Sequence, residues 1–309
     1  MRTVSRDFAD WAPPSIGPDD PAALVLTSAL AQAGHWIALH TPRALAAEPE
    51  GVHLLRATVR RLRSTLRLFR GQTEPRWSES LETELKWLGA VLGAVRDLDV
   101  FADRLVDASE TLDQASFKAL GPLFDDLRDR RRRGMESLRG ALRGARHATL
   151  RERIAAGAPP LSDEADAPCR EALPPLVLAA WNALRRGGRA LALSDPDEAF
   201  HTVRKQAKRA RYAAETVAPA LDPGPCRAAQ RFAKKARRVQ DVLGAHQDAT
   251  IAEAMIQEAA AARPALGPFN LAAGRLIERE SRAATEARAQ FFQVWQALDR
   301  KKSVKWLRV

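Results

Sequence analysis

An internal repeat is the feature of this sequence that most constrains its fold. Residues 53–63 align with residues 201–211, and each copy begins with a histidine. The positions that carry the same residue or the same charge in both copies are His53/His201, Arg56/Arg204, Arg60/Lys208, Arg61/Arg209 and Arg63/Arg211. Further along each half, residues 92–97 read Leu-Gly-Ala-Val-Arg-Asp and residues 243–248 read Leu-Gly-Ala-His-Gln-Asp. Both pairs come in the same order at nearly the same separation, which indicates a duplicated helical unit with a local two-fold relation.

Helical periodicity extends over most of the chain. Aromatic residues make up only 6%, whereas Ala, Leu and Arg are abundant and favour helix over strand. We expect a first helix from residue 21 that ends near Thr41 and Pro42, because proline interrupts the hydrogen-bond ladder. The other predicted helices cover residues 51–70, 78–108, 114–146, 170–194, 198–217, 225–261 and 269–299. No alternating run of β-branched residues predicts a strand, so the expected fold class is all-α.

The chain is expected to divide into two helical halves. Residues 157–169 are acidic and rich in proline, and we interpret them as a linker between a first bundle at 21–156 and a second at 170–300. Residues 1–20 are expected to form a loose lead-in, and residues 301–309 a basic C-terminal tail.

Simple counts exclude several classes of protein. The two cysteines, Cys169 and Cys226, cannot supply a disulfide scaffold or a multi-cysteine zinc module. No uninterrupted apolar run reaches the roughly 18 residues of a membrane-spanning helix. The N-terminal residues lack the apolar core of a secretion signal. We therefore expect a cytoplasmic protein that is not inserted in a membrane.

An excess of positive charge indicates an anionic partner. The chain has 49 Lys and Arg against 38 Asp and Glu, and its pI is about 10.4. On a helical wheel, five arginines of residues 51–70 gather within about one third of the circumference, opposite an apolar face. They are Arg56, Arg60, Arg63, Arg67 and Arg70, and the apolar residues are Leu55, Val59, Leu62, Leu66 and Phe69. In the second copy, His201, Arg204, Lys205, Lys208, Arg209, Arg211 and Tyr212 share one face, opposite Val203, Ala207, Ala210, Ala214 and Val217.

Such faces are either solvated surfaces or ligand sites. Like charges three or four residues apart repel by roughly 0.2–0.5 kcal/mol per pair, and solvated faces usually mix signs. The pattern also occurs twice with its histidine in register, and guanidinium groups bind phosphate bidentately, which favours a ligand site. A third basic cluster adds Lys234, Lys235 and Arg238 to the candidate site. The run at residues 130–133 lies among acidic residues, so we interpret it as a solvated face.

These motifs together resemble the CHAD domain, a conserved-histidine α-helical domain. The matching stretches lie at residues 52–64, 95–99, 201–212 and 239–248, and the resemblance spans roughly residues 20–300. The family implies two antiparallel four-helix bundles related by pseudo-two-fold symmetry, with a basic central groove or pore that binds inorganic polyphosphate. The positions to which the resemblance carries this binding are His53, Arg56, Arg60, Arg63, His201, Arg204, Lys205, Lys208, Arg211 and Tyr212. Arg67 and Arg209 join them from the helical faces, and Arg61 joins them as the repeat partner of Arg209. Ala57 stands opposite Lys205 and Ser64 opposite Tyr212, so the two half-sites are expected to contribute unequally.

Elementary chemistry agrees with this ligand. Polyphosphate carries about one charge per repeating unit and has no bases, so it needs a track of donors and not a stacking platform. The basic faces contain almost no aromatic residues, so nucleic acid is expected only as a non-specific competitor. Expected partners are polyphosphate, polyphosphate granules in the cytoplasm and the enzymes that metabolise polyphosphate. An accessory domain that holds substrate in polyphosphate or triphosphate turnover is the first alternative, and a general nucleic-acid or polyanion binder is the second.

Catalysis is not expected. Residues 82–86 read Glu-Thr-Glu-Leu-Lys, which resembles the metal- and phosphate-binding motif of triphosphate-tunnel domains. That motif needs a strand to aim its side chains one way, and here it lies in a helical pattern. His53 and His201 stand among arginines that would repel a metal ion, so no metal or cofactor is expected. Asp97 and Asp248, at equivalent positions, are interpreted as orienting an arginine or capping a turn, not as an acid and a base.

Overall fold

The structure, a computed structural model, describes residues 14–48, 50–157 and 159–307. Ten α-helices account for most of them, and two isolated β-bridges, but no strand, occur within these ranges. The helices are α1 (Ala23–Leu45), α2 (Gly51–Leu68), α3 (Pro75–Ser109), α4 (Gln114–Ala119), α5 (Gly121–Arg143), α6 (Ala145–Ala155), α7 (Cys169–Ala190), α8 (Asp197–Val217), α9 (Pro223–Ala261) and α10 (Gly267–Leu298). Short 3-10 turns are η1 (Arg70–Gln72), η2 (Asp163–Asp166), η3 (Ala218–Ala220), η4 (Lys301–Ser303) and η5 (Lys305–Leu307). The all-α prediction is confirmed.

The predicted end of the first helix was wrong. Helix α1 continues through Pro42 to Leu45. Its side facing the core, which includes Ile37 and Ala44, is buried, and the Thr41 hydroxyl donates to the Ile37 carbonyl at 2.6 Å. Packing of this face outweighs the single hydrogen bond that proline removes.

The predicted helix at 114–146 is three helices. The chain breaks before Pro122, which lacks the N–H needed to continue α4, and again at Gly144, whose backbone is extended. Helix α6 then runs on to Ala155, beyond the predicted end.

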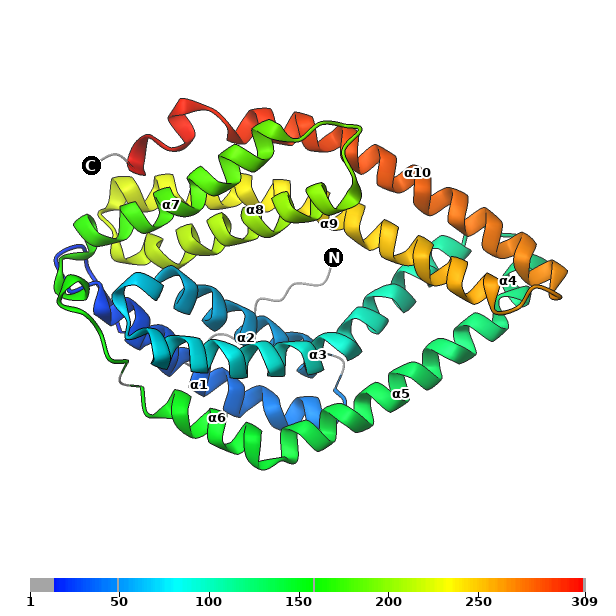
Figure 1. Ribbon diagram of the computed structural model, residues 1–309, viewed down its shortest axis with the longest axis horizontal. Helices are drawn as coiled ribbons and strands as arrows, with labels where there is room; N and C mark the ends of the chain where they lie inside the picture. Colours follow the sequence, from blue (N-terminus) through cyan, green and yellow to red (C-terminus); the bar gives the residue numbers. More distant parts are fainter. Residues whose placement is uncertain (1–13, 49, 158, 308–309) are drawn as a thin grey trace.

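The helices of each half lie on one side of the molecule. Figure 1 shows α7, α8, α9 and α10 above α1, α2, α3, α5 and α6, with α4 at the narrow end, where α3, α5, α9 and α10 converge. Across the middle, α2 packs against α8. The predicted apolar faces of α2 and α8, at Leu55 to Phe69 and Val203 to Val217, are buried as expected.

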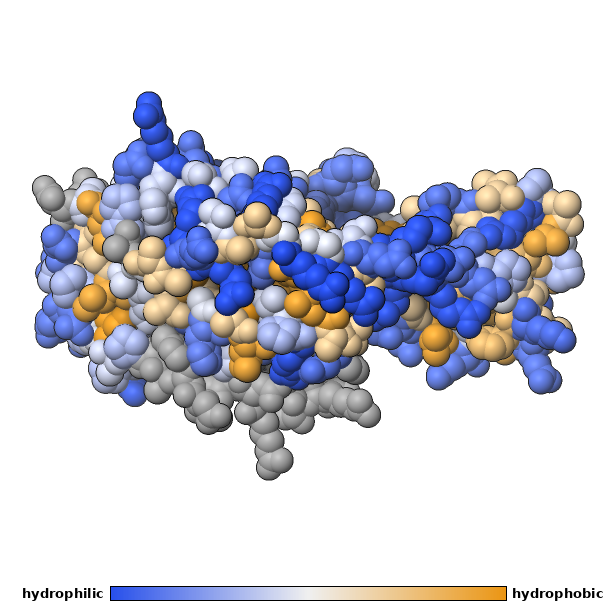
Figure 2. All heavy atoms as spheres, turned by 90° about the horizontal axis from the view of Figure 1, so that it is seen from below, coloured by the Kyte–Doolittle hydropathy of each residue, from blue (hydrophilic) through white to orange (hydrophobic). Residues whose placement is uncertain are grey.

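The apolar core has two parts, and residues from both halves of the chain build each part. The larger cluster takes side chains from α1, α2 and α3 and from α7, α8 and α9. The smaller one lies at the narrow end, where Phe101 and Leu123 pack with Ile256 and Phe269. Seen from the side of α5 and α6, hydrophilic side chains form a band over the narrower end, with separate hydrophobic patches beside it (Figure 2).

The segments expected to be a lead-in, a linker and a tail are held by specific contacts. The Cys169 N–H donates to the Asp20 carbonyl at 2.9 Å, and the Ala22 N–H donates to the Ala167 carbonyl at 3.0 Å. Near the C-terminus, Trp306 and Leu307 are buried in the larger cluster. The lead-in prediction at residues 1–13 and the tail prediction at 308–309 lie outside the described residues.

Candidate functional site

The basic faces of α2 and α8 meet where the two helices pack together. Arg56 and Arg60 of α2 lie beside Lys208 and Arg211 of α8, with Arg204 close by. We call these five residues the central cluster. Each helix buries its apolar face in the core, so its charged face is left along the junction between the two halves.

The central cluster carries concentrated positive charge, of which Asp97 and Glu215 compensate only a part. Burial, followed by the charges of Arg60, Arg204, Arg56 and Arg211, lowers the pKa of Lys208 to about 7. Burial also lowers the pKa of Arg60, and Arg56 and Arg211 add to that effect. Within the described ranges, neither Arg60 nor Lys208 forms an ion pair with a carboxylate. Such a cluster is poised to receive an anion, because an anion restores the interactions that these cations lost on burial.

The Tyr212 ring packs against two arginines of the central cluster. The ring is 4% exposed and lies 4.4 Å from the Arg211 guanidinium carbon and 5.8 Å from that of Arg60. These are cation–π distances. The ring therefore helps to hold two arginines from different helices in place.

Several donors in this region are buried and have no protein partner. Among the described residues, the Nε–H groups of Arg60 and Arg204 donate no hydrogen bond, and Nδ1 of His201 takes part in none. The Arg211 Nε is also without a hydrogen bond, but it lies 3.3 Å from Glu215 as an ion pair. Buried polar groups are normally satisfied, so unpaired donors beside uncompensated charge are the mark of a site for an acceptor-rich ligand.

A glycine and an aspartate accompany the equivalent arginine in each half. Arg56 lies across Gly93, where an added Cβ would be 3.4 Å from its Nη2, and its guanidinium is 3.1 Å from Asp97. Asp97 therefore orients an arginine, as one of the two sequence interpretations held. In the other half, Arg204 lies across Gly244, with a Cβ-to-Nε distance of 3.7 Å.

Asp248 completes this arrangement in the second half. Its pKa is raised by burial, and Arg204 opposes the shift. The glycine of the repeated Leu-Gly-Ala motif thus leaves room for an arginine to cross the helix beside the aspartate. Gly93 and Gly244 were absent from the predicted site although they belong to the repeat.

The repeat also contains two neighbours of the histidines that sequence reasoning missed. Burial lowers the pKa of His53, and the nearby Arg96 adds to this effect. Burial likewise lowers the pKa of His201, followed by Lys205, while a hydrogen bond with Gln247 opposes the change. Arg96 and Gln247 occupy the same position of the second motif, so comparing the two motifs was the signal that could have revealed them.

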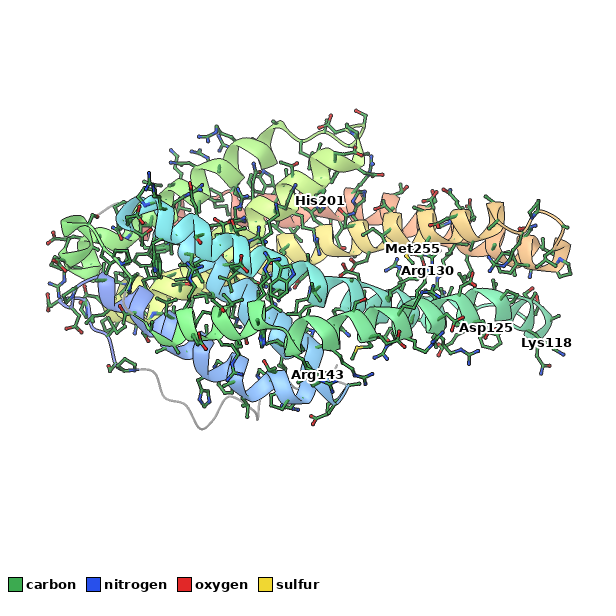
Figure 3. All side chains as sticks on the ribbon, turned by 60° about the horizontal axis from the view of Figure 1, so that its bottom comes forward. Lys118, Asp125, Arg130, Arg143, His201 and Met255 are labelled. Atoms are coloured by element: carbon green, nitrogen blue, oxygen red, sulfur yellow. The ribbon has the colours of Figure 1, made fainter. Side chains whose placement is uncertain are left out.

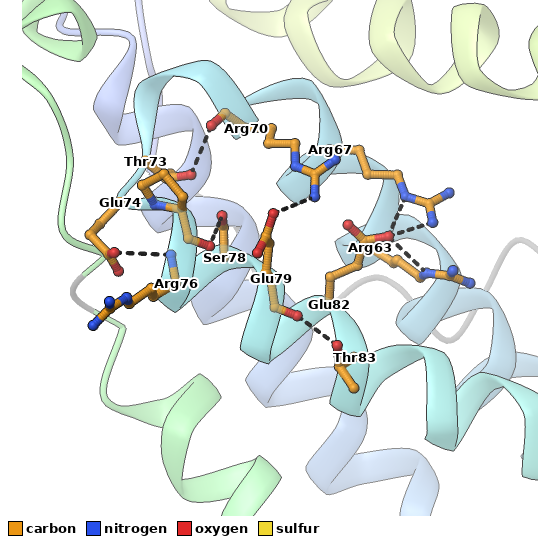
Figure 4. Close-up of polar contacts among 11 residues, drawn as sticks. Arg63, Arg67, Arg70, Thr73, Glu74, Arg76, Ser78, Glu79, Glu82 and Thr83 are labelled. Carbon is orange, nitrogen blue, oxygen red and sulfur yellow. Dashed lines mark hydrogen bonds and ion pairs between the residues drawn. The ribbon is translucent and has the colours of Figure 1, made fainter.

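At the end of α2, acidic residues of α3 neutralise the arginines. Figure 4 shows Arg63 and Arg67 around Glu82, with the Arg63 Nε at 3.6 Å, and Arg70 paired with Glu79 at 2.9 Å. Burial raises the pKa of Glu82, but hydrogen bonding with Arg67 and the charges around it lower the pKa overall. Arg63 and Arg67 therefore have a carboxylate partner, whereas Arg60 has none among the described residues.

The remaining predicted site residues lie outside the central cluster. Arg61, Lys205 and Arg209 are exposed at its flanks. Arg209 is near enough to Arg63 to lower the pKa of that arginine, although burial is the main cause.

The three basic residues predicted on α9 are not among the main cations that act on Lys208, which are all on α2 and α8. Lys234 and Arg238 are exposed. The Lys235 ammonium donates to the Ser303 hydroxyl at 2.8 Å, beside the C-terminal segment. Lys235 stands nine residues before Gly244, which places it half a turn around the helix at about 100° per residue.

Two other sequence motifs have structural roles. The Glu82–Lys86 motif lies in helix α3, where Glu82 pairs with Arg63 and Arg67, and Glu84 pairs with Arg146 of α6 at 2.7 Å. In the run 130–133, Arg132 pairs locally with Asp129 at 3.2 Å, as predicted. Arg130 instead reaches Glu258 of α9, also at 3.2 Å, from the side of α5 that Figure 3 shows facing α9.

The CHAD domain family matches residues 28–257, and the chain therefore belongs to this family. It is 29% identical over 303 residues to two uncharacterized proteins of Mycobacterium tuberculosis, MT2285 and Rv2226, covering 92% of this chain and 54% of each relative. The chain thus spans about half the length of these relatives.

Two solved structures share its fold. One is PptA from Streptomyces chartreusis, with a TM-score of 0.75, 24% identity, and coverage of 89% of this chain and 99% of that one. The other is the CHAD domain from the plant Ricinus communis, with a TM-score of 0.73, 22% identity, and coverage of 93% and 96%. Separately, within the described part of the chain, no helix is both long enough and apolar enough to cross a bilayer.

Proposed function

We propose that this protein binds inorganic polyphosphate at the central cluster, without catalysing a reaction. The observation that carries the proposal is Lys208, which is half-buried against Arg60, Arg204, Arg56 and Arg211 and has no carboxylate partner among the described residues. A polyanion that follows the junction of α2 and α8 would meet cations from both helices. Membership of the CHAD domain family supports this ligand.

The proposed architecture is two four-helix bundles related by a pseudo-two-fold axis. Three sets of equivalent positions support it. Arg60 and Lys208, which align in the repeat, lie next to each other at the junction. Arg56 with Gly93 corresponds to Arg204 with Gly244. His53 with Arg96 corresponds to His201 with Gln247. An axis near Arg60 and Lys208 would make one continuous basic groove from two half-sites. They differ where Ala57 stands opposite Lys205 and Ser64 opposite Tyr212.

Polyphosphate suits the central cluster better than nucleic acid does. Bases need exposed aromatic faces, yet the Tyr212 ring is buried beneath two guanidinium groups. Phosphate groups need only donors, which Arg60 and Arg204 supply through unpaired Nε atoms. Binding is expected to weaken steeply with salt, because phosphate contacts release condensed counterions.

Competition binding tests the proposal. Long-chain polyphosphate is titrated at physiological salt into the wild type, Arg60→Ala/Lys208→Ala, and a control with the same loss of charge, Arg133→Ala/Arg143→Ala on the exposed face of α5. We expect the central variant to lose at least tenfold in affinity and the control less than threefold. Equal losses in both variants, or displacement by tRNA at equal phosphate concentration, would show generic polyanion binding instead.

A substrate-holding role is the second candidate function. The curated relatives are about twice as long as the part that this chain matches, so in them the CHAD domain is joined to other sequence. In such proteins the groove could retain polyphosphate or triphosphate for a neighbouring enzyme or attach the protein to a polyphosphate granule. Phosphate release by the chain alone in the presence of a divalent metal would contradict the non-enzymatic proposal.

A further inference from the structure

A second group of cations, without carboxylate partners among the described residues, lies where α9 meets the C-terminal segment. Lys235 is surrounded by Arg231 of the same helix and by Arg300 and Lys302. We call these four residues the terminal patch. Burial lowers the pKa of Lys235, and the three cations lower it further, with no carboxylate among the main causes.

Specific contacts hold the terminal patch together against its own repulsion. The Ser303 hydroxyl accepts from the Lys235 ammonium at 2.8 Å, and the Ser303 N–H donates to the Arg300 carbonyl, also at 2.8 Å. Just beyond, Trp306 is buried, with its ring 6.2 Å from that of Phe232 on α9. The C-terminal cations therefore have a fixed position on α9, whereas those of a free tail would separate.

No carboxylate neutralises this patch. Among the described residues, none of its four cations forms an ion pair with an acidic side chain. The nearest acid in sequence, Asp299, is engaged by Arg185 at 3.3 Å and by Arg189 at 2.5 Å. Arg231, Arg300 and Lys302 are exposed, so an external anion can reach all three.

The terminal patch is separate from the central cluster. Gly244 of α9 supports Arg204 of the central cluster, and Lys235 lies half a turn around the same helix from it. The cations that act on Lys208 are all on α2 and α8, whereas those that act on Lys235 are on α9 and the C-terminal segment. A ligand group at one site is therefore not shared with the other.

We propose that the terminal patch is a second binding site for the phosphate groups of inorganic polyphosphate, so that one protein molecule holds two chain segments at once. Its ligand identity rests on the proposed function of the central cluster. Among the described residues, the exposed large apolar side chains lie away from the patch: Val106, Phe117 and Leu271 are on other helices, and Ile251 of α9 stands 16 residues beyond Lys235. The patch therefore lacks the apolar anchors that favour a membrane surface and the exposed rings that favour nucleic acid. The patch offers only the hydrogen-bond donors of its Lys and Arg side chains, and these are the groups that a phosphate polymer needs.

Stoichiometry tests this proposal. An oligophosphate too short to span both sites is titrated calorimetrically into four proteins. These are the wild type, the terminal variant Arg231→Gln/Arg300→Gln/Lys302→Gln, the central variant Arg60→Ala/Lys208→Ala, and a charge-matched control, Arg133→Gln/Arg143→Gln/Arg151→Gln. We expect two bound molecules for the wild type and the control, and one for each site variant. With long-chain polyphosphate, light scattering should show cross-linked particles for the wild type and control only.

The outcomes separate the two proposals. If the terminal variant still binds two molecules and still cross-links chains, the second site is overturned while the central site stands. If the central variant still binds two oligophosphate molecules, the proposed function fails. The number bound by the terminal variant then shows separately whether the terminal patch is a binding site. Vesicles containing phosphatidylserine, and tRNA, serve as further probes. Binding to either that depends on the patch, with no change in oligophosphate stoichiometry, would assign the patch to that ligand and overturn the proposal.

Discussion

At the level of single residues, the positive charge of Lys208, which we propose for polyphosphate binding, lowers the stability of the free protein. Burial and then the neighbouring arginines lower its pKa to about 7, whereas an unfolded chain would have a value of about 10.4. The unfolded state therefore binds more protons between these values. Below about pH 7, Lys208 is protonated in both states, so its unfavourable charge in the folded state lowers the free energy of unfolding in full. This destabilisation declines as the pH rises toward 10.

Replacing Lys208 by Met, which keeps the apolar stem and removes the charge, should stabilise the free protein. We expect the free energy of unfolding to rise by about 1 kcal/mol at pH 6, less than the full pKa shift implies because solvent screens a half-buried charge. The gain should vanish near pH 10. Urea unfolding at both pH values measures it, with the exposed Lys205→Met as control. A Lys208→Met protein less stable than the wild type at pH 6 would show that the ammonium group is structural.

The pH dependence of polyphosphate binding should have two separable parts. A bound polyanion raises the pKa of Lys208, so affinity should be full below about pH 7 and fall as the pH rises through 7 to 9. Burial lowers the pKa of His53 and that of His201, so their contribution should appear only at a more acidic pH than that of Lys208. Fluorescence anisotropy should show that Lys208→Met removes the upper part and that a His53→Ala/His201→Ala variant removes the lower part. A profile unchanged in both variants would exclude all three groups.

At the level of helices, Gly93 and Gly244 leave space for an arginine side chain of the neighbouring helix to lie across them. Leucine at Gly93 would place side-chain atoms where the Arg56 guanidinium lies, near Asp97. We expect Gly93→Leu to keep its helix content, since leucine favours helix over glycine, and to lose about fivefold in polyphosphate affinity, or about 1 kcal/mol. Circular dichroism and binding titrations measure the two effects. Gly140→Leu on α5, where nothing lies within 4 Å, should bind like the wild type.

At the level of the whole molecule, buried contacts at the narrow end join the two halves of the chain. Arg104 of α3 pairs with Glu280 of α10 at 2.5 Å, and the Glu280 side chain is only 3% exposed. Glu280→Gln should lower the free energy of unfolding by about 2–4 kcal/mol, because it leaves Arg104 without a charged partner. Glu278→Gln, which breaks the Glu278–Arg282 pair that is 69% exposed on both sides, should cost less than about 0.5 kcal/mol. Chemical denaturation compares them, and equal losses would contradict this role for burial.

Much of the fold follows from local properties of the sequence. Apolar spacing predicted the all-α class and the buried faces of α2 and α8, because packing one face of a helix requires that period. Boundaries failed where distant contacts decided them, as at Pro42, where burial of neighbouring residues carries α1 onward. The predicted cations at positions 56, 60, 204, 208 and 211 come together, but their binding of polyphosphate stays a prediction.

The sequence by itself determined which residues are equivalent, since a repeat and its helical faces can be compared without coordinates. Only the tertiary structure decided which cations keep their charge unpaired. Arg63 and Arg60 look alike in the sequence, yet Glu82 of α3 reaches the first and no carboxylate among the described residues pairs with the second. Lys235 of α9 likewise contacts Ser303 of the C-terminal segment, and the cations that act on it are not those of the central cluster. The reason is physical: Coulombic interaction depends on distance in space and on burial, and both are set by how separate helices pack.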